Sequence, residues 1–257
     1  MAESDKMKIP VKPVFLFADS QILFWKGKEG LILQRIKQLI AEDDPKKKKI
    51  RAAYIGASNG DKKEFYDIFL SAVSQVGIES KDCMLIKSKP SKKEIAFFEK
   101  ADLVLLAGGD TKKGWDIMNG NGIREKLVDR YHNGAVLLGV SAGAVQLGTR
   151  GWAETGDGPD DYDVFTTFQL VPFVIDVHDE EEGQWERLHR SVENGEEHCR
   201  GFGIPTGGGA IFHPDWSMEA IRHPLAEFSL FPDGLKNSMI FPPGPESSEE
   251  KKRAIES

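Results

Sequence analysis

The sequence predicts a three-layer α/β sandwich in which a mostly parallel sheet is flanked by helices, as in flavodoxin-like domains. The first observation is a series of short apolar runs bounded by small or turn-forming residues, typical of strands buried on both faces. The second is that longer segments of helical periodicity separate these runs, which is the βαβ rhythm of a parallel sheet. The runs are PVFLFA at 13–18, IRAAYIGA at 50–57, DCMLIK at 82–87, ADLVLLAGG at 101–109 and GAVLLGV at 134–140.

The segments between the runs supply the flanking helices. Those at 28–42 and 62–77 place apolar residues three and four positions apart, so each has one stripe to bury against the sheet. After residue 150 the pattern changes. The elements expected there are a polar loop at 152–163, a strand at 171–178, a charged helix at 181–193, and short strands near 200–205, 209–213 and 227–231 that extend one edge of the sheet.

The length and composition of the chain fit a single domain built around one hydrophobic core. The chain has 257 residues, of which 40% are apolar, and this length is near the upper limit for a single core. Residues 13–241 are predicted to form one α/β domain. Residues 1–12 are predicted to be a flexible N-terminus, and residues 242–257, rich in Pro, Ser and mixed charge, a disordered tail.

Composition excludes several classes of partner. The chain has 34 basic and 41 acidic residues and a net charge of -7, which disfavours a nucleic-acid partner. Because it has no apolar run long enough to cross a bilayer, we expect a soluble, cytoplasmic protein with no membrane partner. Cys83 and Cys199 are too few for a disulfide framework or a zinc cluster and are expected to be buried or idle thiols.

The segment LLGVSAGAVQLG at 137–148 carries the main chemical signal. A buried strand runs into Gly139-Val140-Ser141-Ala142-Gly143 and then into small, helix-compatible residues. G-x-S-x-G between a strand and a helix is the context of a nucleophile elbow, in which a strained turn presents a serine hydroxyl above the sheet. Ser141 is therefore the predicted nucleophile.

Two backbone N–H groups are candidates for an oxyanion hole. The helix expected to start at Ala142 directs its free N–H groups and positive dipole end toward the serine. A second glycine turn, at 106–111, follows the preceding strand and offers N–H groups from the other side. We predict Gly109 and Ala142 as the pair.

A serine nucleophile needs a base, normally an imidazole. His178 is the best candidate because it ends the apolar strand VPFVID and precedes an acidic stretch. His213 follows a strand and is a weaker candidate. The other histidines lie in charged segments, where a solvated surface position is expected: His132, His189, His198 and His223.

These residues resemble the serine peptidases that include cyanophycinase and the aspartyl dipeptidases (dipeptidase E), which have a fold like that of class I glutamine amidotransferases. Motifs at 108–111, 139–144 and 175–178 match in order, and the resemblance covers roughly residues 13–213. It implies Ser141 as nucleophile and His178 as general base. Asp110 and Thr111 would line the oxyanion and substrate pocket, and Asp176 is a further predicted substrate-binding residue.

The chain departs from the pattern around the base. Val177, Asp179, Glu182 and Gln184 replace a glutamine, a phenylalanine and arginines of the cyanophycinase branch. A substrate carboxylate would therefore be held less well there. The late G-I-D-E segment appears as Gly203-Ile204-Pro205-Thr206, without a carboxylate, and leaves Asp176, Asp179 and Glu181 as alternatives for the third member of the triad.

The sequence thus predicts a serine hydrolase that cleaves an amide or peptide bond in a small substrate through an acyl-enzyme on Ser141, with no metal or cofactor. A homodimer is one form of assembly compatible with it. An esterase of α/β-hydrolase type is disfavoured because its histidine normally lies near the end of the chain. A glutamine amidotransferase is disfavoured because neither cysteine lies in an elbow. The remaining alternative is a binding protein that keeps the fold with a degraded triad.

Overall fold

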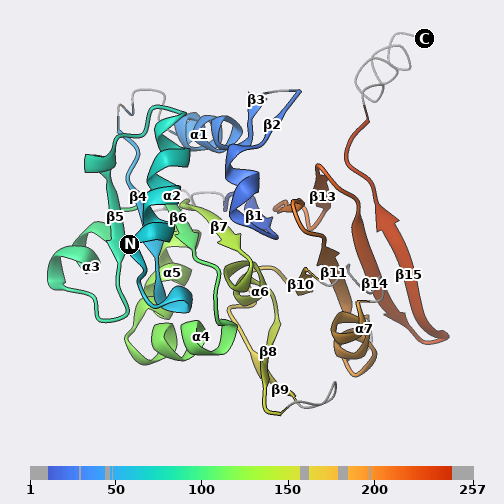
Figure 1. Ribbon diagram of the computed structural model, residues 1–257. Coiled ribbons are helices and arrows are strands. Elements are labelled where there is room, and N and C mark those ends of the chain that lie inside the picture. The colour runs from blue at the N-terminus through green and yellow to red at the C-terminus, as the bar shows by residue number, and fades with distance from the viewer. Residues whose placement is uncertain are drawn as a thin grey trace, which may run out of the picture.

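The computed structural model describes residues 11–28, 30–43, 47, 49–156, 162–178, 185–196 and 198–244. It confirms the three-layer α/β arrangement (Figure 1). A seven-stranded sheet has the order β13-β12-β1-β7-β6-β4-β5, in which the five predicted runs form consecutive parallel strands. Its strands are β1 (Val14–Phe17), β4 (Ala52–Ile55), β5 (Cys83–Ile86), β6 (Leu103–Leu106), β7 (Val136–Val140), β12 (Gly209–Phe212) and β13 (Met218–Ile221). The last two continue the sheet antiparallel beyond β1.

Helices cover both faces of this sheet, which explains why its central strands are continuous apolar runs. Alternate residues of each strand enter two different core clusters, one with α1 and α2 and the other with α4, α5 and α6. In β1, Phe15 and Phe17 belong to the first cluster, and Val14 and Leu16 to the second. The helices are α1 (Ile32–Asp43), α2 (Lys63–Ser74), α3 (Lys92–Phe98), α4 (Thr111–Gly120), α5 (Ile123–His132) and α6 (Ala142–Leu147).

A second, four-stranded sheet has the order β10-β11-β14-β15 and packs against α7 (Glu186–Glu193). Its strands are β10 (Val174–Val177), β11 (Arg200–Ile204), β14 (Leu225–Phe231) and β15 (Gly234–Ile240). The expectation that segments near 200–205 and 227–231 extend the central sheet was wrong. The position beside β1 is occupied by β12, so these strands pair with β10 and with each other instead.

The segment predicted as a polar loop at 152–163 also differs. Residues at both of its ends belong to two antiparallel strands that pair with each other, β8 (Arg150–Glu154) and β9 (Tyr162–Thr166). Its polar character reflects an exposed ribbon, since β9 is largely exposed. Residues 157–161 lie outside the described residues, as do most of the predicted N-terminal segment (1–10) and tail (245–257).

Several short elements lie outside the two larger sheets. They are a small hairpin of β2 (Lys26–Gly27) and β3 (Gly30–Leu31), and the 3-10 helices η1 (Ser20–Phe24), η2 (Ala57–Asn59) and η3 (Ser80–Asp82). The first two of these 3-10 helices directly follow β1 and β4. Among the described helices, none has the length and apolar character that a bilayer span requires.

Candidate active site

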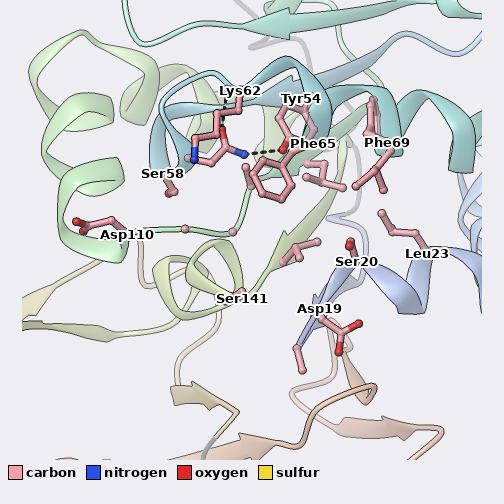
Figure 2. Close-up of a pocket in the computed structure, with 18 of the residues that line it drawn as sticks. Asp19, Ser20, Leu23, Tyr54, Ser58, Lys62, Phe65, Phe69, Asp110 and Ser141 are labelled. Carbon is pink, nitrogen blue, oxygen red and sulfur yellow. Dashed lines mark hydrogen bonds between the residues drawn. The ribbon is translucent and has the colours of Figure 1, made fainter.

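A cavity of about 590 Å³ opens where the parallel strands end (Figure 2). The residues that follow β1, β4, β6 and β7 all contribute to its lining, through Asp19, Ser58, Gly108 and Ser141. This is the position where open α/β sheets bind ligands, because the strand-to-helix connections diverge there.

Ser141 lies between β7 and α6 in a strained backbone conformation, with φ of 50° and ψ of -115°. Its N–H donates to the carbonyl of Phe17 (2.9 Å), which continues the pairing of β7 with β1. Its carbonyl accepts from the N–H groups of Ala144 and Val145 at 2.8 and 3.2 Å. Such a conformation costs about 1–3 kcal/mol and persists only when the surroundings impose it.

The glycines of the elbow are required by close backbone contacts. A Cβ atom on Gly139 would lie 2.5 Å from the carbonyl oxygen of Gly143. One on Gly143 would lie 2.2 Å from the carbonyl oxygen of Leu106, in the neighbouring strand β6. The turn can therefore pass between two strands only where side chains are absent.

The second glycine turn lies directly against the serine. A Cβ atom on Gly108 would be 3.1 Å from the Cβ of Ser141, and Gly109 has φ of 132° with its Cα facing the carbonyl of Ser58. Gly109 lines the cavity, whereas Ala142, the first residue of α6, is buried behind it. In the described part of the chain neither backbone N–H donates to a protein acceptor.

His178 lines the same cavity as Ser141 and follows β10. Its φ is 66°, and its N–H donates to the carbonyl of Ile204 (3.3 Å). Its Nδ1 is 3.1 Å from Oγ1 of Thr206. Across the described residues no hydrogen bond joins His178 to Ser141.

Thr206 was missed by sequence reasoning. The segment that carries it, Gly203–Thr206, is where the sequence lacks the family's carboxylate, so the signal was a hydroxyl in the place of an acid. The structure puts that hydroxyl beside the imidazole because β11 pairs with β10 in parallel, and both strands end at the same edge.

Of the three predicted substrate-binding residues, one lines the cavity and two do not. Asp110 lines the cavity, and its carboxylate accepts from the N–H of Lys113 (2.8 Å) and caps α4. Thr111 begins α4 and is not part of the lining. Asp176 is 1% exposed, accepts from the N–H of Val177 (2.8 Å), and lies 3.7 Å from the guanidinium of Arg187. Its burial keeps it away from the cavity.

A buried glutamine connects the loops around the elbow. Gln146, in α6, donates to the carbonyl of Thr111 (2.8 Å) and to Oγ of Ser58 (3.1 Å) and is 0% exposed. This side chain links α6 to α4 and η2. It therefore helps to fix the position of the glycine turn at 106–111 relative to Ser141.

Other sequence candidates lie elsewhere. Nε2 of His213 is 2.9 Å from Glu219, which also pairs with Arg35, and His213 does not line the cavity. Cys83 and Cys199 are free, and burial raises the pKa of both thiols, to about 11 for Cys83. Within the ranges described, no group of three His, Cys, Asp or Glu side chains could hold a metal ion. Asp179, Glu181, Glu182 and Gln184 lie outside those ranges.

Comparison with known proteins identifies related folds and the family of the chain. Among solved structures, a peptidase from an acI-B1 Actinobacterium is similar, with a TM-score of 0.62 and 15% identity over 91% of this chain and 96% of that one. A putative peptidase E protein from Listeria monocytogenes has a TM-score of 0.55 and 16% identity over 82% of this chain and 98% of its own. Such identities show a shared fold.

Comparison with curated sequences finds no match. The model of peptidase family S51 matches residues 25–218, which is most of the chain. The chain therefore belongs to peptidase family S51, which confirms the resemblance to serine peptidases of the cyanophycinase and dipeptidase E type.

Proposed function

We propose that this peptidase cleaves an amide or peptide bond of a small substrate through an acyl-enzyme on Ser141. The observation that carries the proposal is the strained backbone of Ser141 in the wall of a cavity that it shares with His178. A cavity of about 590 Å³ suits a substrate of a few residues, since ligand pockets run from about 300 to 1,000 Å³.

In the proposed reaction, Oγ of Ser141 attacks the substrate carbonyl carbon while His178 accepts the hydroxyl proton. The carbonyl oxygen becomes an oxyanion, stabilised by the N–H groups of Gly109 and Ala142. The C–N bond then breaks, and His178 gives its proton to the leaving amine. Water attacks the acyl-enzyme by the same steps, which releases the acid product and restores the serine.

Thr206 determines which imidazole nitrogen takes part. When Nδ1 carries hydrogen and donates to the Thr206 hydroxyl, Nε2 is left as the acceptor for the serine proton. A hydroxyl orients the ring but carries no charge to stabilise the imidazolium that forms. We therefore expect slower chemistry than a carboxylate partner would support.

A fluorophosphonate tests the nucleophile without knowledge of the substrate. Oγ of an activated serine displaces fluoride from phosphorus, so labelling of Ser141 is expected in the native protein and absent in Ser141→Ala. His178→Ala is expected to lower the labelling rate by a factor of about a thousand while the circular dichroism spectrum is retained. A folded protein that stays unlabelled would contradict the assignment of Ser141.

A further inference from the structure

One wall of the active-site cavity is apolar and lies across it from Ser141. It consists of Leu23 from η1, Tyr54 from β4, and Phe65, Ile68 and Phe69 from α2. We call these five residues the apolar wall. Figure 2 shows Leu23, Phe65 and Phe69 extending from their helices on the side opposite Ser141.

The deeper part of the wall is buried and closely packed. Leu23, Tyr54 and Phe69 are at most 4% exposed, and the rings of Tyr54 and Phe69 pack with their centroids 5.5 Å apart. The Tyr54 hydroxyl accepts from Nδ2 of Asn59 (2.8 Å), and burial raises the pKa of Tyr54 to about 12. The wall is therefore uncharged at neutral pH.

The outer part of the wall consists of apolar side chains that are exposed to solvent and do not belong to the hydrophobic core. Phe65 is 45% and Ile68 37% exposed, although helix α2 buries Phe69, Ala72 and Val73 against the sheet. Phe65, Ile68 and Phe69 share one helix face because they are three and four positions apart. Exposed apolar side chains that continue a buried apolar surface mark a binding site.

The charged side chains of the cavity lie outside this wall. Asp19 accepts from the N–H groups of Gln21 (2.8 Å) and Gly207 (2.6 Å), so its carboxylate already has backbone donors. Lys62 and Lys113 also line the cavity, and neither ammonium forms an ion pair with the described residues. An acidic substrate side chain would be recognised by these lysines, and an apolar one by the wall.

We propose that the apolar wall is the subsite for a large aliphatic or aromatic side chain on the acyl side of the scissile bond. This inference rests on the proposed role of Ser141, because the acyl residue is bonded to that serine and its side chain would extend across the cavity to the wall. The wall has more surface than a methyl group can cover, and its exposed members would lose water contact only when a large side chain occupies it.

Diphenyl α-aminoalkylphosphonates with different side chains test the subsite directly. Oγ of Ser141 bonds to phosphorus, phenoxide leaves, and the serine proton departs with it as phenol. The rate of modification therefore reports the fit of the side chain beside the serine. We expect the benzyl and isobutyl compounds to react about tenfold to a hundredfold faster than the methyl compound. Equal rates, or a fastest reaction with the carboxymethyl compound, would overturn the proposal in favour of the lysines.

Two phenylalanines of similar exposure provide a matched pair of variants. Phe65→Ala shortens the wall and is expected to lower the benzyl-to-methyl rate ratio about fivefold or more. Phe231→Ala is the control, because Phe231 is 41% exposed at the end of β14 and lies outside the cavity, and the ratio is expected to stay unchanged. An unchanged ratio in Phe65→Ala would refute the subsite.

Fluorophosphonate labelling separates the two possible failures. A fluorophosphonate with methyl and ethoxy substituents has no group large enough to fill the wall, so its labelling rate is expected to be about the same in both phenylalanine variants and the wild type. If Ser141 is labelled but the phosphonates show no preference for large apolar groups, only the subsite is wrong. If Ser141 is not labelled, the proposed nucleophile and the subsite both fail.

Discussion

Replacing Thr206 by valine removes the hydroxyl beside His178 and keeps the shape of the side chain. The two atoms involved, Nδ1 of His178 and Oγ1 of Thr206, are 3.1 Å apart at an exposed position. A neutral hydrogen bond of this kind contributes about 0.5–1.5 kcal/mol net. It becomes roughly twice as strong when the imidazole is protonated in the transition state.

The hydrogen bond between Thr206 and His178 is therefore stronger in the transition state than in the ground state by about 1 kcal/mol. This difference corresponds to about a fivefold change in rate. This is far below the factor of about 10⁴ that follows the disruption of a triad carboxylate in well-studied serine peptidases. We expect Thr206→Val to lower the second-order rate of fluorophosphonate labelling about fivefold, because the imidazole spends less time in the productive tautomer.

The assay compares three variants across pH 5–9. Thr206→Ser keeps the hydroxyl and is expected to label at close to the wild-type rate. Thr206→Asp adds a carboxylate at the same place and is expected to label faster than the wild type above neutral pH. Equal rates in Thr206→Val and the wild type would refute the orienting role. A thermal melt of each variant excludes a change in folding.

Three further predictions concern the scaffold of the site. Gly143→Ala places a Cβ atom 2.2 Å from the carbonyl oxygen of Leu106, and we expect urea unfolding to show a loss of about 1–3 kcal/mol or more. Gln146→Leu leaves the part-buried carbonyl of Thr111 without its donor, so a loss of about 1–3 kcal/mol is expected, together with slower labelling of Ser141. For Glu219, burial raises the pKa, but hydrogen bonding and charge from Arg35 outweigh it and the net pKa is lowered. Its contribution to stability is thus present above the ordinary glutamate pKa of about 4.3 and lost as pH falls through the lower folded value. The pH dependence of the melting temperature in Glu219→Gln should be flatter in that acid range than in the wild type.

Much of the central sheet could be predicted because its strands are buried on both faces. In β6 and β7 every residue is buried, so each strand is a continuous apolar run that local sequence reveals. The elbow was equally visible, since a strained turn between a strand and a helix needs small residues at fixed positions around Ser141. These features depend on neighbours along the chain, and the sequence determined them.

Tertiary structure alone decided the features that depend on residues far apart in sequence. Strands β10 and β11 are largely buried, as are those of the central sheet, yet they form a second sheet because β12 occupies the edge of β1. The periodicity of α2 showed that one face is apolar. It could not show that Phe65 at the start of the helix extends past the sheet into the cavity.

The surroundings of His178 show most clearly which features local sequence determines and which depend on tertiary structure. The sequence identified the histidine at the end of a strand and the absence of a carboxylate at 203–206. Only the parallel pairing of β10 with β11 places the Thr206 hydroxyl at the imidazole, and only the packing around β10 buries Asp176 away from the cavity. Local sequence determines which side chains are available. Strand pairing and core packing decide which of them meet, because those contacts join segments that no local pattern connects.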